Sequence, residues 1–126
     1  MVVVDDKLEL AETLADGLSD RGYDARAIGH GGDALALIEA GAVDVLVTDL
    51  RMPEPDGMML LAAAHRYDPT LPVIVMTGYG AIDSAMEAIR RGAFHYLSKP
   101  FKVDELAAFV DRALADRAVR AGKVSR

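Results

Sequence analysis

The chain has 126 residues, of which 52% are hydrophobic and 27% charged, a composition typical of one folded domain and not of a disordered segment. It contains no cysteine, which excludes disulfides and thiolate metal ligands, and its net charge of −6 argues against nonspecific nucleic-acid binding. The apolar runs are too short to cross a membrane and the N-terminus lacks a signal-peptide pattern, so we expect a cytoplasmic protein.

Short runs rich in valine and isoleucine alternate with longer segments whose apolar residues recur at helical spacing. In chain order, the runs predict strands at residues 2–4, 24–28, 44–48, 72–76 and 94–98. The helical patterns fall at residues 8–18, 34–38, 59–64, 82–89 and 106–114. Gly22, Gly41 and Gly92 stand where helices should end, as C-terminal caps do.

Five strand–helix pairs in alternation predict a parallel sheet with helices on both faces. The runs show no polar alternation, which indicates strands buried on both sides. Because crossover connections are right-handed, a five-stranded doubly wound α/β sheet is the simplest arrangement. We expect one domain over residues 1–118, followed by a linker or tail at 119–126, where the apolar pattern is lost.

Polar side chains stand where four of the five strands end. Asp5 and Asp6 follow the first strand, Asp49 the third, Thr77 the fourth and Lys99 the fifth. Because the ends of parallel strands meet at one edge of the sheet, we expect these groups to gather in a ligand site there.

Three close carboxylates repel one another unless a cation compensates. Oxygen ligands without histidine or cysteine favour a hard ion, and Mg²⁺ fits best because it takes few carboxylates and keeps several waters. A carboxylate between a divalent cation and Lys99 is a plausible nucleophile toward phosphorus, since phosphoryl transfer needs its charge neutralised.

Four segments at these strand ends resemble the receiver domain of bacterial two-component response regulators. They are VVVDD, VTDLRMPEPDG, VIVMTGYG and FHYLSKPF, in that order, and the resemblance extends to about residue 118. It implies the flavodoxin-like receiver fold, with strand order 2-1-3-4-5 and five helices. The segment TGYGAIDSAMEAIRRGAFHYLSKPF is similar to receivers of the nitrogen-regulation class, which control sigma-54 transcription activators.

The resemblance also implies roles for the acidic residues. Asp49 would accept a phosphoryl group from the histidine of a sensor kinase. Asp6, Asp49 and the backbone carbonyl of Arg51 would bind Mg²⁺ directly, and Asp5 would act mainly through water. Lys99 would contact the phosphoryl or carboxylate oxygens.

Further implied roles concern the switch. Thr77 would turn its hydroxyl to the phosphoryl group and Tyr96 would turn inward after it. The Lys99–Pro100 bond would be cis, and Asp56-Gly57 would begin the third helix. The face formed by helix 82–91, strand 94–98 and helix 103–117 would dimerise or bind an output partner.

Simpler interpretations exist for each residue. Asp5 and Asp6 could cap the first helix, Thr77 could make a turn bond, Lys99 could be a surface lysine and Tyr96 ordinary core. Two other functions remain open: an aspartyl-phosphate phosphatase or phosphotransferase, and a flavodoxin-like FMN module. Arg51 counts against the first, because such enzymes commonly carry a second acid two residues past the nucleophile. We do not expect an enzyme in the turnover sense, only self-catalysed phosphotransfer and autodephosphorylation.

Tyr79, two residues past Thr77, is bulky enough to restrict the water that hydrolyses an acyl phosphate. We therefore predict that Tyr79→Ala changes the autodephosphorylation rate. The measurement is the lifetime of the phosphorylated domain in magnesium buffer, and a lifetime unchanged by the substitution would contradict the prediction.

Overall fold

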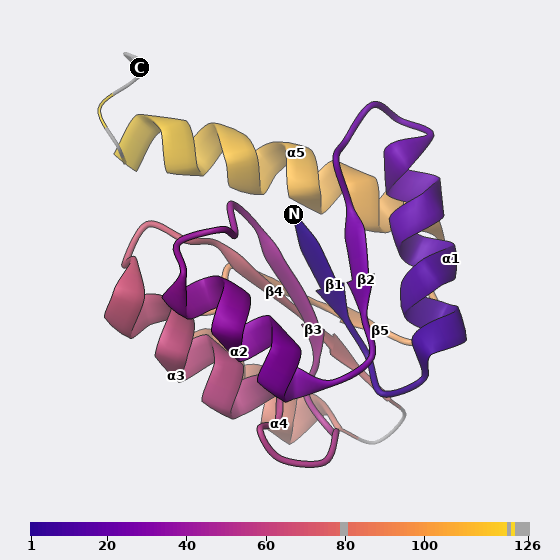
Figure 1. The fold of residues 1–126 in the computed structure, drawn as a ribbon, viewed down its shortest axis with the longest axis horizontal. Helices are drawn as coiled ribbons and strands as arrows, with labels where there is room; N and C mark the ends of the chain where they lie inside the picture. The colour runs from indigo at the N-terminus through magenta and orange to yellow at the C-terminus, as the bar shows by residue number, and fades with distance from the viewer. Residues whose placement is uncertain (79–80, 121, 123–126) are drawn as a thin grey trace.

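The computed structural model describes residues 1–78, 81–120 and 122 (Figure 1). In this part of the chain five strands alternate with five helices. The strands are β1 (Val2–Val4), β2 (Arg26–Ile28), β3 (Leu46–Asp49), β4 (Val73–Thr77) and β5 (His95–Ser98). The helices are α1 (Leu8–Ser19), α2 (Gly31–Glu39), α3 (Gly57–Tyr67), α4 (Ile82–Arg90) and α5 (Val103–Arg120).

All neighbouring strands pair in parallel in the order β2-β1-β3-β4-β5, which confirms the predicted sheet. Helices α2, α3 and α4 cover one face of the sheet, and α1 and α5 cover the other (Figure 1). Each strand contributes to both layers of core because alternate side chains point to opposite faces. Val2 and Val4 belong to the cluster under α2–α4, whereas Val3 belongs to the cluster under α1 and α5.

β1 has the predicted bounds, and the bounds of the other strands differ from the prediction by one or two residues. β2 begins at Arg26 instead of residue 24, because the pairing with β1 begins at Val2 opposite Arg26. β3 and β4 each run one residue further than predicted, so that Asp49 and Thr77 are the last residues of their strands. Their backbones are held by pairing with the next strand, Asp49 opposite Met76 and Thr77 opposite Ser98.

Helix ends follow local capping chemistry. Gly22, Gly41 and Gly92 have positive φ angles of 93°, 70° and 103°, the left-handed conformation that glycine adopts most readily at helix ends. Asp56 caps α3 as expected, since its side chain accepts the N–H of Met59 at 3.0 Å. α2 begins earlier than its apolar pattern, because His30 Nδ1 accepts the N–H of Gly32 at 2.9 Å.

α5 extends to Arg120, beyond both the helix end predicted at 117 and the domain boundary predicted at 118. Its last buried residue is Ala113. Further along, Arg117 donates to the carbonyl of Asp44 at 3.3 Å and to the Asp68 carboxylate at 2.9 Å. These contacts tie the end of the helix to the segments preceding β3 and β4. Among the described residues, no helix combines the length and apolar character that a membrane span needs.

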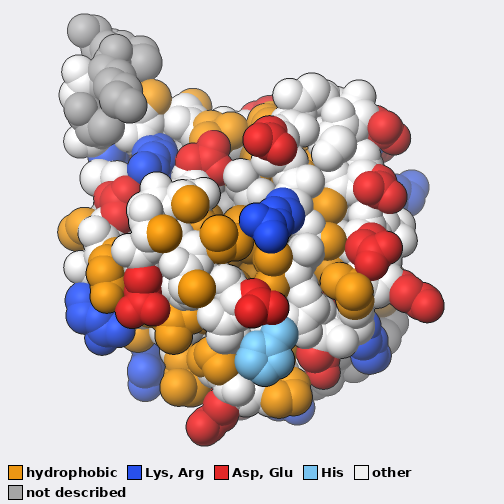
Figure 2. Space-filling model, in the orientation of Figure 1, with side chains coloured by type: hydrophobic (Ala, Val, Ile, Leu, Met, Phe, Trp, Pro, Cys, Tyr) orange, Lys and Arg blue, Asp and Glu red, His pale blue; other side chains and the backbone are white. Residues whose placement is uncertain are grey.

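The exposed surface differs between the two helical layers (Figure 2). The outer face of α1 carries Glu9, Glu12 and Asp16, all exposed, and the exposed Asp20 follows at its C-terminal cap. Apolar side chains gather instead over α2 and α3, where Met59 is 46% and Tyr67 51% exposed.

Gly57, at the start of α3, lies directly against the backbone at the end of β3. A Cβ atom there would overlap the carbonyl oxygen of Asp49 and lie 2.7 Å from Cα of Leu50. Neither backbone group can move without disturbing the strand that carries Asp49.

We predict that Gly57→Ala lowers the free energy of unfolding by about 2–3 kcal/mol, the scale of overpacking against atoms that cannot yield. Denaturant unfolding followed by circular dichroism measures the loss. Gly78→Ala is the matched control, because its added methyl group meets no atom of the described residues within 4 Å. Equal stabilities of the two variants would contradict the close approach.

Candidate functional site

Three carboxylates converge at the edge of the sheet where the strands end. Asp5 follows β1 and Asp49 ends β3, and the pairing of Val4 with Thr48 places these two acids next to each other. Together with Asp6 they each offer an oxygen within 4.8 Å of the others. Asp5 is fully buried and Asp49 is 8% exposed, while Asp6 lies at the surface. The cluster is therefore reachable from solvent on the Asp6 side.

Lys99 brings a positive charge to the same cluster from the far side of the sheet. Its Nζ donates to Asp5 Oδ2 at 2.8 Å and lies 3.6 Å from Asp49 Oδ2. Its backbone N–H donates to the carbonyl of Thr77 at 2.7 Å, and the Lys99–Pro100 peptide bond is cis. The ammonium group thus contacts both buried acids, which is not the environment of a surface lysine.

Both oxygens of Asp5 have partners in the structure. Oδ1 accepts the N–H of Lys7 at 2.9 Å and Oδ2 accepts the Lys99 ammonium. The residue at the N-cap position of α1 is Lys7, and its side chain makes no capping bond. Asp5 therefore supports the entry into α1 while it holds Lys99 in place.

Burial raises the pKa of the Asp49 carboxyl, and the nearby charges of Asp5 and Asp6 raise it further. Lys99 and a hydrogen bond from the Arg51 backbone amide act in the opposite direction without reversing the shift. The folded domain therefore disfavours the ionised form of Asp49, and a bound cation would stabilise that form. This is the electrostatic setting expected for a cation site.

Thr77 and Tyr96 lie on the neighbouring strands β4 and β5. Thr77 is 3% exposed, and its hydroxyl donates to the carbonyl of Leu97 at 3.5 Å, a long and therefore weak bond. Tyr96 is partly buried against the core cluster on the α2–α4 side, and pairs with Val75. Arg51 is exposed in the loop after β3. Tyr79 lies outside the described residues.

A pocket of about 200 Å³ lies next to Lys99. The sequence alone does not predict this pocket. It is lined by Leu10 and Leu14 of α1 together with Lys99, Pro100 and Phe101. The helical spacing of the two leucines predicts an apolar face. Only the fold shows that part of this face remains open beside the carboxylate cluster.

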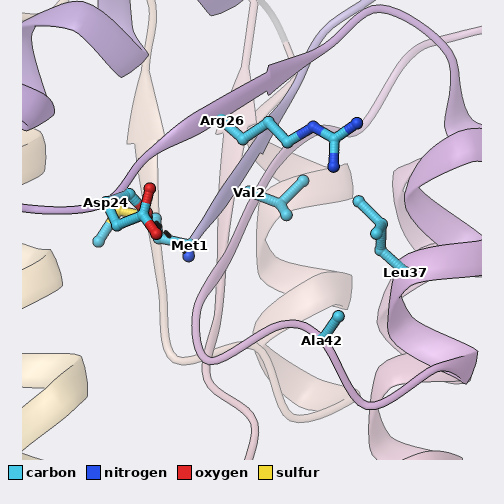
Figure 3. A pocket seen from close by; sticks show the side chains of 6 residues that line it. All are labelled: Met1, Val2, Asp24, Arg26, Leu37 and Ala42. Atoms are coloured by element: carbon cyan, nitrogen blue, oxygen red, sulfur yellow. Dashed lines mark hydrogen bonds between the residues drawn. The ribbon is translucent and has the colours of Figure 1, made fainter.

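A second pocket of about 200 Å³ lies where the strands begin, at the opposite end of the sheet (Figure 3). Met1, Val2, Asp24, Arg26, Leu37 and Ala42 line it. It contains none of the strand-end groups described above. The polar groups predicted for the site therefore lie together at the other end of the sheet, where the three carboxylates meet.

Comparison with known proteins agrees with this geometry. The sequence profile described as "Response regulator receiver domain" matches residues 1–111. The chain belongs to the response regulator receiver family.

Relatives of this receiver domain are transcription regulators. It is 41% identical over 112 residues to the DNA-binding transcriptional regulator NtrC of Proteus hauseri, covering 89% of this chain and 24% of that protein. It is 38% identical over 114 residues to the regulatory protein AtoC of Escherichia coli K12, covering 90% of this chain and 25% of that protein. The chain thus spans about a quarter of the length of these relatives.

Among solved structures, NtrX from Brucella abortus, crystallised in complex with ATP, superposes with a TM-score of 0.89 at 35% identity. The match covers 96% of this chain and 28% of that one. These similarities confirm the predicted likeness to receivers of the nitrogen-regulation class.

We predict that Asp49→Asn stabilises the metal-free domain at pH 7 by roughly 1 kcal/mol, the usual scale of a single-residue effect. A raised folded-state pKa means that the folded domain binds the proton more tightly than the unfolded chain. Stability is therefore lost as the pH rises from the ordinary carboxyl value through the raised one. The asparagine variant escapes this loss.

Denaturant unfolding in a chelating buffer, repeated over a series of pH values, measures the effect. Asp83→Asn, which removes an exposed acid on α4, is the control. A stability difference between Asp49→Asn and wild type that stays constant across this pH interval would contradict the prediction.

Proposed function

We propose that this receiver domain is a phosphorylation-controlled switch in which Asp49 accepts a phosphoryl group from the histidine of a sensor kinase. The observation that carries the proposal is the position of Asp49. Its carboxylate lies at the solvent-reachable edge of the sheet, beside two acids and 3.6 Å from the Lys99 ammonium.

The donor set fits Mg²⁺, because three carboxylate oxygens lie close together without a histidine among them. Asp6, Asp49 and the carbonyl of Arg51 would hold the ion, and Asp5 would reach it through water. When bound, the ion supplies positive charge to the equatorial phosphoryl oxygens.

The transfer step needs only one new bond. An oxygen of Asp49 forms a bond to phosphorus, while the bond from phosphorus to the histidine nitrogen breaks and its electron pair stays on the nitrogen. Lys99 is positioned to stabilise the negative charge of the phosphoryl oxygens during transfer, since its ammonium already contacts Asp5 and lies near Asp49. The product is an acyl phosphate, and the domain performs no turnover beyond this transfer and its own hydrolysis.

The response follows from the groups around the acceptor. Among the described residues, the Thr77 hydroxyl makes one long bond, to the carbonyl of Leu97, so a phosphoryl oxygen offers it a better acceptor. Movement of Thr77 would let Tyr96 turn inward and change the face formed by α4, β5 and α5. Ile82 (52% exposed) and Met86 (37% exposed) present apolar surface there. We propose that this face dimerises or contacts the output part of a sigma-54-type activator.

The pocket beside Lys99 suits the kinase. It offers an apolar hollow between α1 and the loop after β5, next to the acceptor. A helix of the kinase seated there would bring its phosphohistidine toward Asp49.

We predict that acetyl phosphate with Mg²⁺ adds one phosphoryl group to the wild-type domain and none to Asp49→Ala. Intact-protein mass spectrometry measures the addition, and amide NMR shifts in β4, α4 and β5 report the switch. Lys99→Ala should slow phosphorylation roughly 100-fold, the scale of one lost electrostatic contact in a transition state.

The control is Asp20→Ala, which removes an exposed acid at the C-terminal end of α1, outside the carboxylate cluster and the α4–β5–α5 face, and should behave as wild type. Phosphorylation of Asp49→Ala at the wild-type rate would refute the assignment of the acceptor.

A further inference from the structure

A hollow lies along one side of α3, next to α2. Met59, Ala62, Ala63 and Arg66 follow the i, i+3, i+4, i+7 spacing that places side chains on one side of a helix. They line a pocket of about 260 Å³ together with Leu35 and Pro55.

Charges of opposite sign lie near the two ends of α3. Glu54 precedes Pro55 at the N-terminal end of α3, and Arg66 lies in its last turn. Both side chains are exposed. Across residues 1–78, 81–120 and 122, neither of them forms an ion pair. A partner for this face should therefore offer a cation at one end and an anion at the other.

A second copy of the same helix, running antiparallel, has that arrangement. We propose that α3 packs against α3 of a second copy about a two-fold axis near Ala62, the midpoint of the helix. Arg66 of each copy then faces the Glu54 end of the other, so that the surface is self-complementary. The small side chain of Ala62 lets the helices approach closely, and the flexible Met59 of each copy fills the hollow of the other.

The small area of this interface makes the association weak. One helix pair buries less than the roughly 1,200 Å² of a stable interface, so we expect a dissociation constant on the order of 100 µM or weaker. It becomes effective when two copies are already held together, because tethering raises the local concentration. The α3 surface does not include α4, β5 or α5. The proposed α3 pairing is therefore separate from the proposed switch and does not depend on Asp49.

The absence of cysteine makes a direct test possible. Ala62→Cys places one thiol at the two-fold axis, where its partner lies within disulfide reach. Ser19→Cys, at the exposed last residue of α1 and outside both α3 and the α4–β5–α5 face, is the control. Under the same mild oxidation at about 100 µM protein, we expect Ala62→Cys to form the covalent dimer roughly tenfold faster than Ser19→Cys.

Charge variants in the Ala62→Cys background separate the proposed pairing from random collision. Arg66→Glu should slow crosslinking to the control rate, and adding Glu54→Arg should restore it. Both positions are exposed, so circular dichroism should show an unchanged fold. Equal rates for Ala62→Cys and Ser19→Cys overturn the proposal, as does an unaffected rate in Arg66→Glu or no restoration in the double variant.

Two further variants distinguish the α3 pairing from the proposed switch. In the Ala62→Cys background, Asp49→Ala and Ile82→Arg should both leave the crosslinking rate unchanged. A rate that falls with either variant would mean that the crosslink reports the α4–β5–α5 face and would overturn the α3 pairing.

Discussion

The parallel pairing of β1 with β3 is the constraint on which the site depends. Val4 lies opposite Thr48, so the next residue of each strand, Asp5 and Asp49, leaves the sheet at the same level. The side chains of β1 alternate between the two core layers, with Val2 and Val4 under α2–α4 and Val3 under α1 and α5. A slip of one residue would exchange these layers and move Asp5 out of level with Asp49. The strand register therefore decides which carboxylates meet.

Bringing these carboxylates together is unfavourable in itself. Burial and the neighbouring acids raise the pKa of Asp49, and Lys99 offsets only part of that effect. Lys99 lies nearer to Asp5 than to Asp49, at 2.8 Å against 3.6 Å. The apolar layers on both sides of the sheet hold the acids in place despite their repulsion. Local strain of this kind is common at functional sites, where chemistry takes precedence over stability.

The site and the proposed switch face are connected through β4 and β5. Thr77 ends β4, its carbonyl accepts the backbone N–H of Lys99, and its hydroxyl reaches the carbonyl of Leu97. Tyr96 and Leu97 point to opposite faces of β5, one toward the core beneath α4 and the other toward α5. A change at Thr77 therefore has a short physical route to both helices. The α3 surface lies outside this route, which is why the two faces are separable.

The sequence alone determined the fold class, the strand order through its family resemblance, and the identity of the residues at the strand ends. Asp5, Asp49 and Lys99 are visible there because each follows an apolar run, and parallel strands end at one edge. Tertiary structure decided what no local pattern encodes. His30 begins α2 ahead of its apolar pattern because it accepts the N–H of Gly32, a capping role rarely taken by histidine. α5 continues to Arg120 past its last buried residue, where Arg117 contacts Asp44 and Asp68. Only the folded chain shows that Lys99 binds Asp5 more closely than Asp49, because that distance depends on three strands meeting in space.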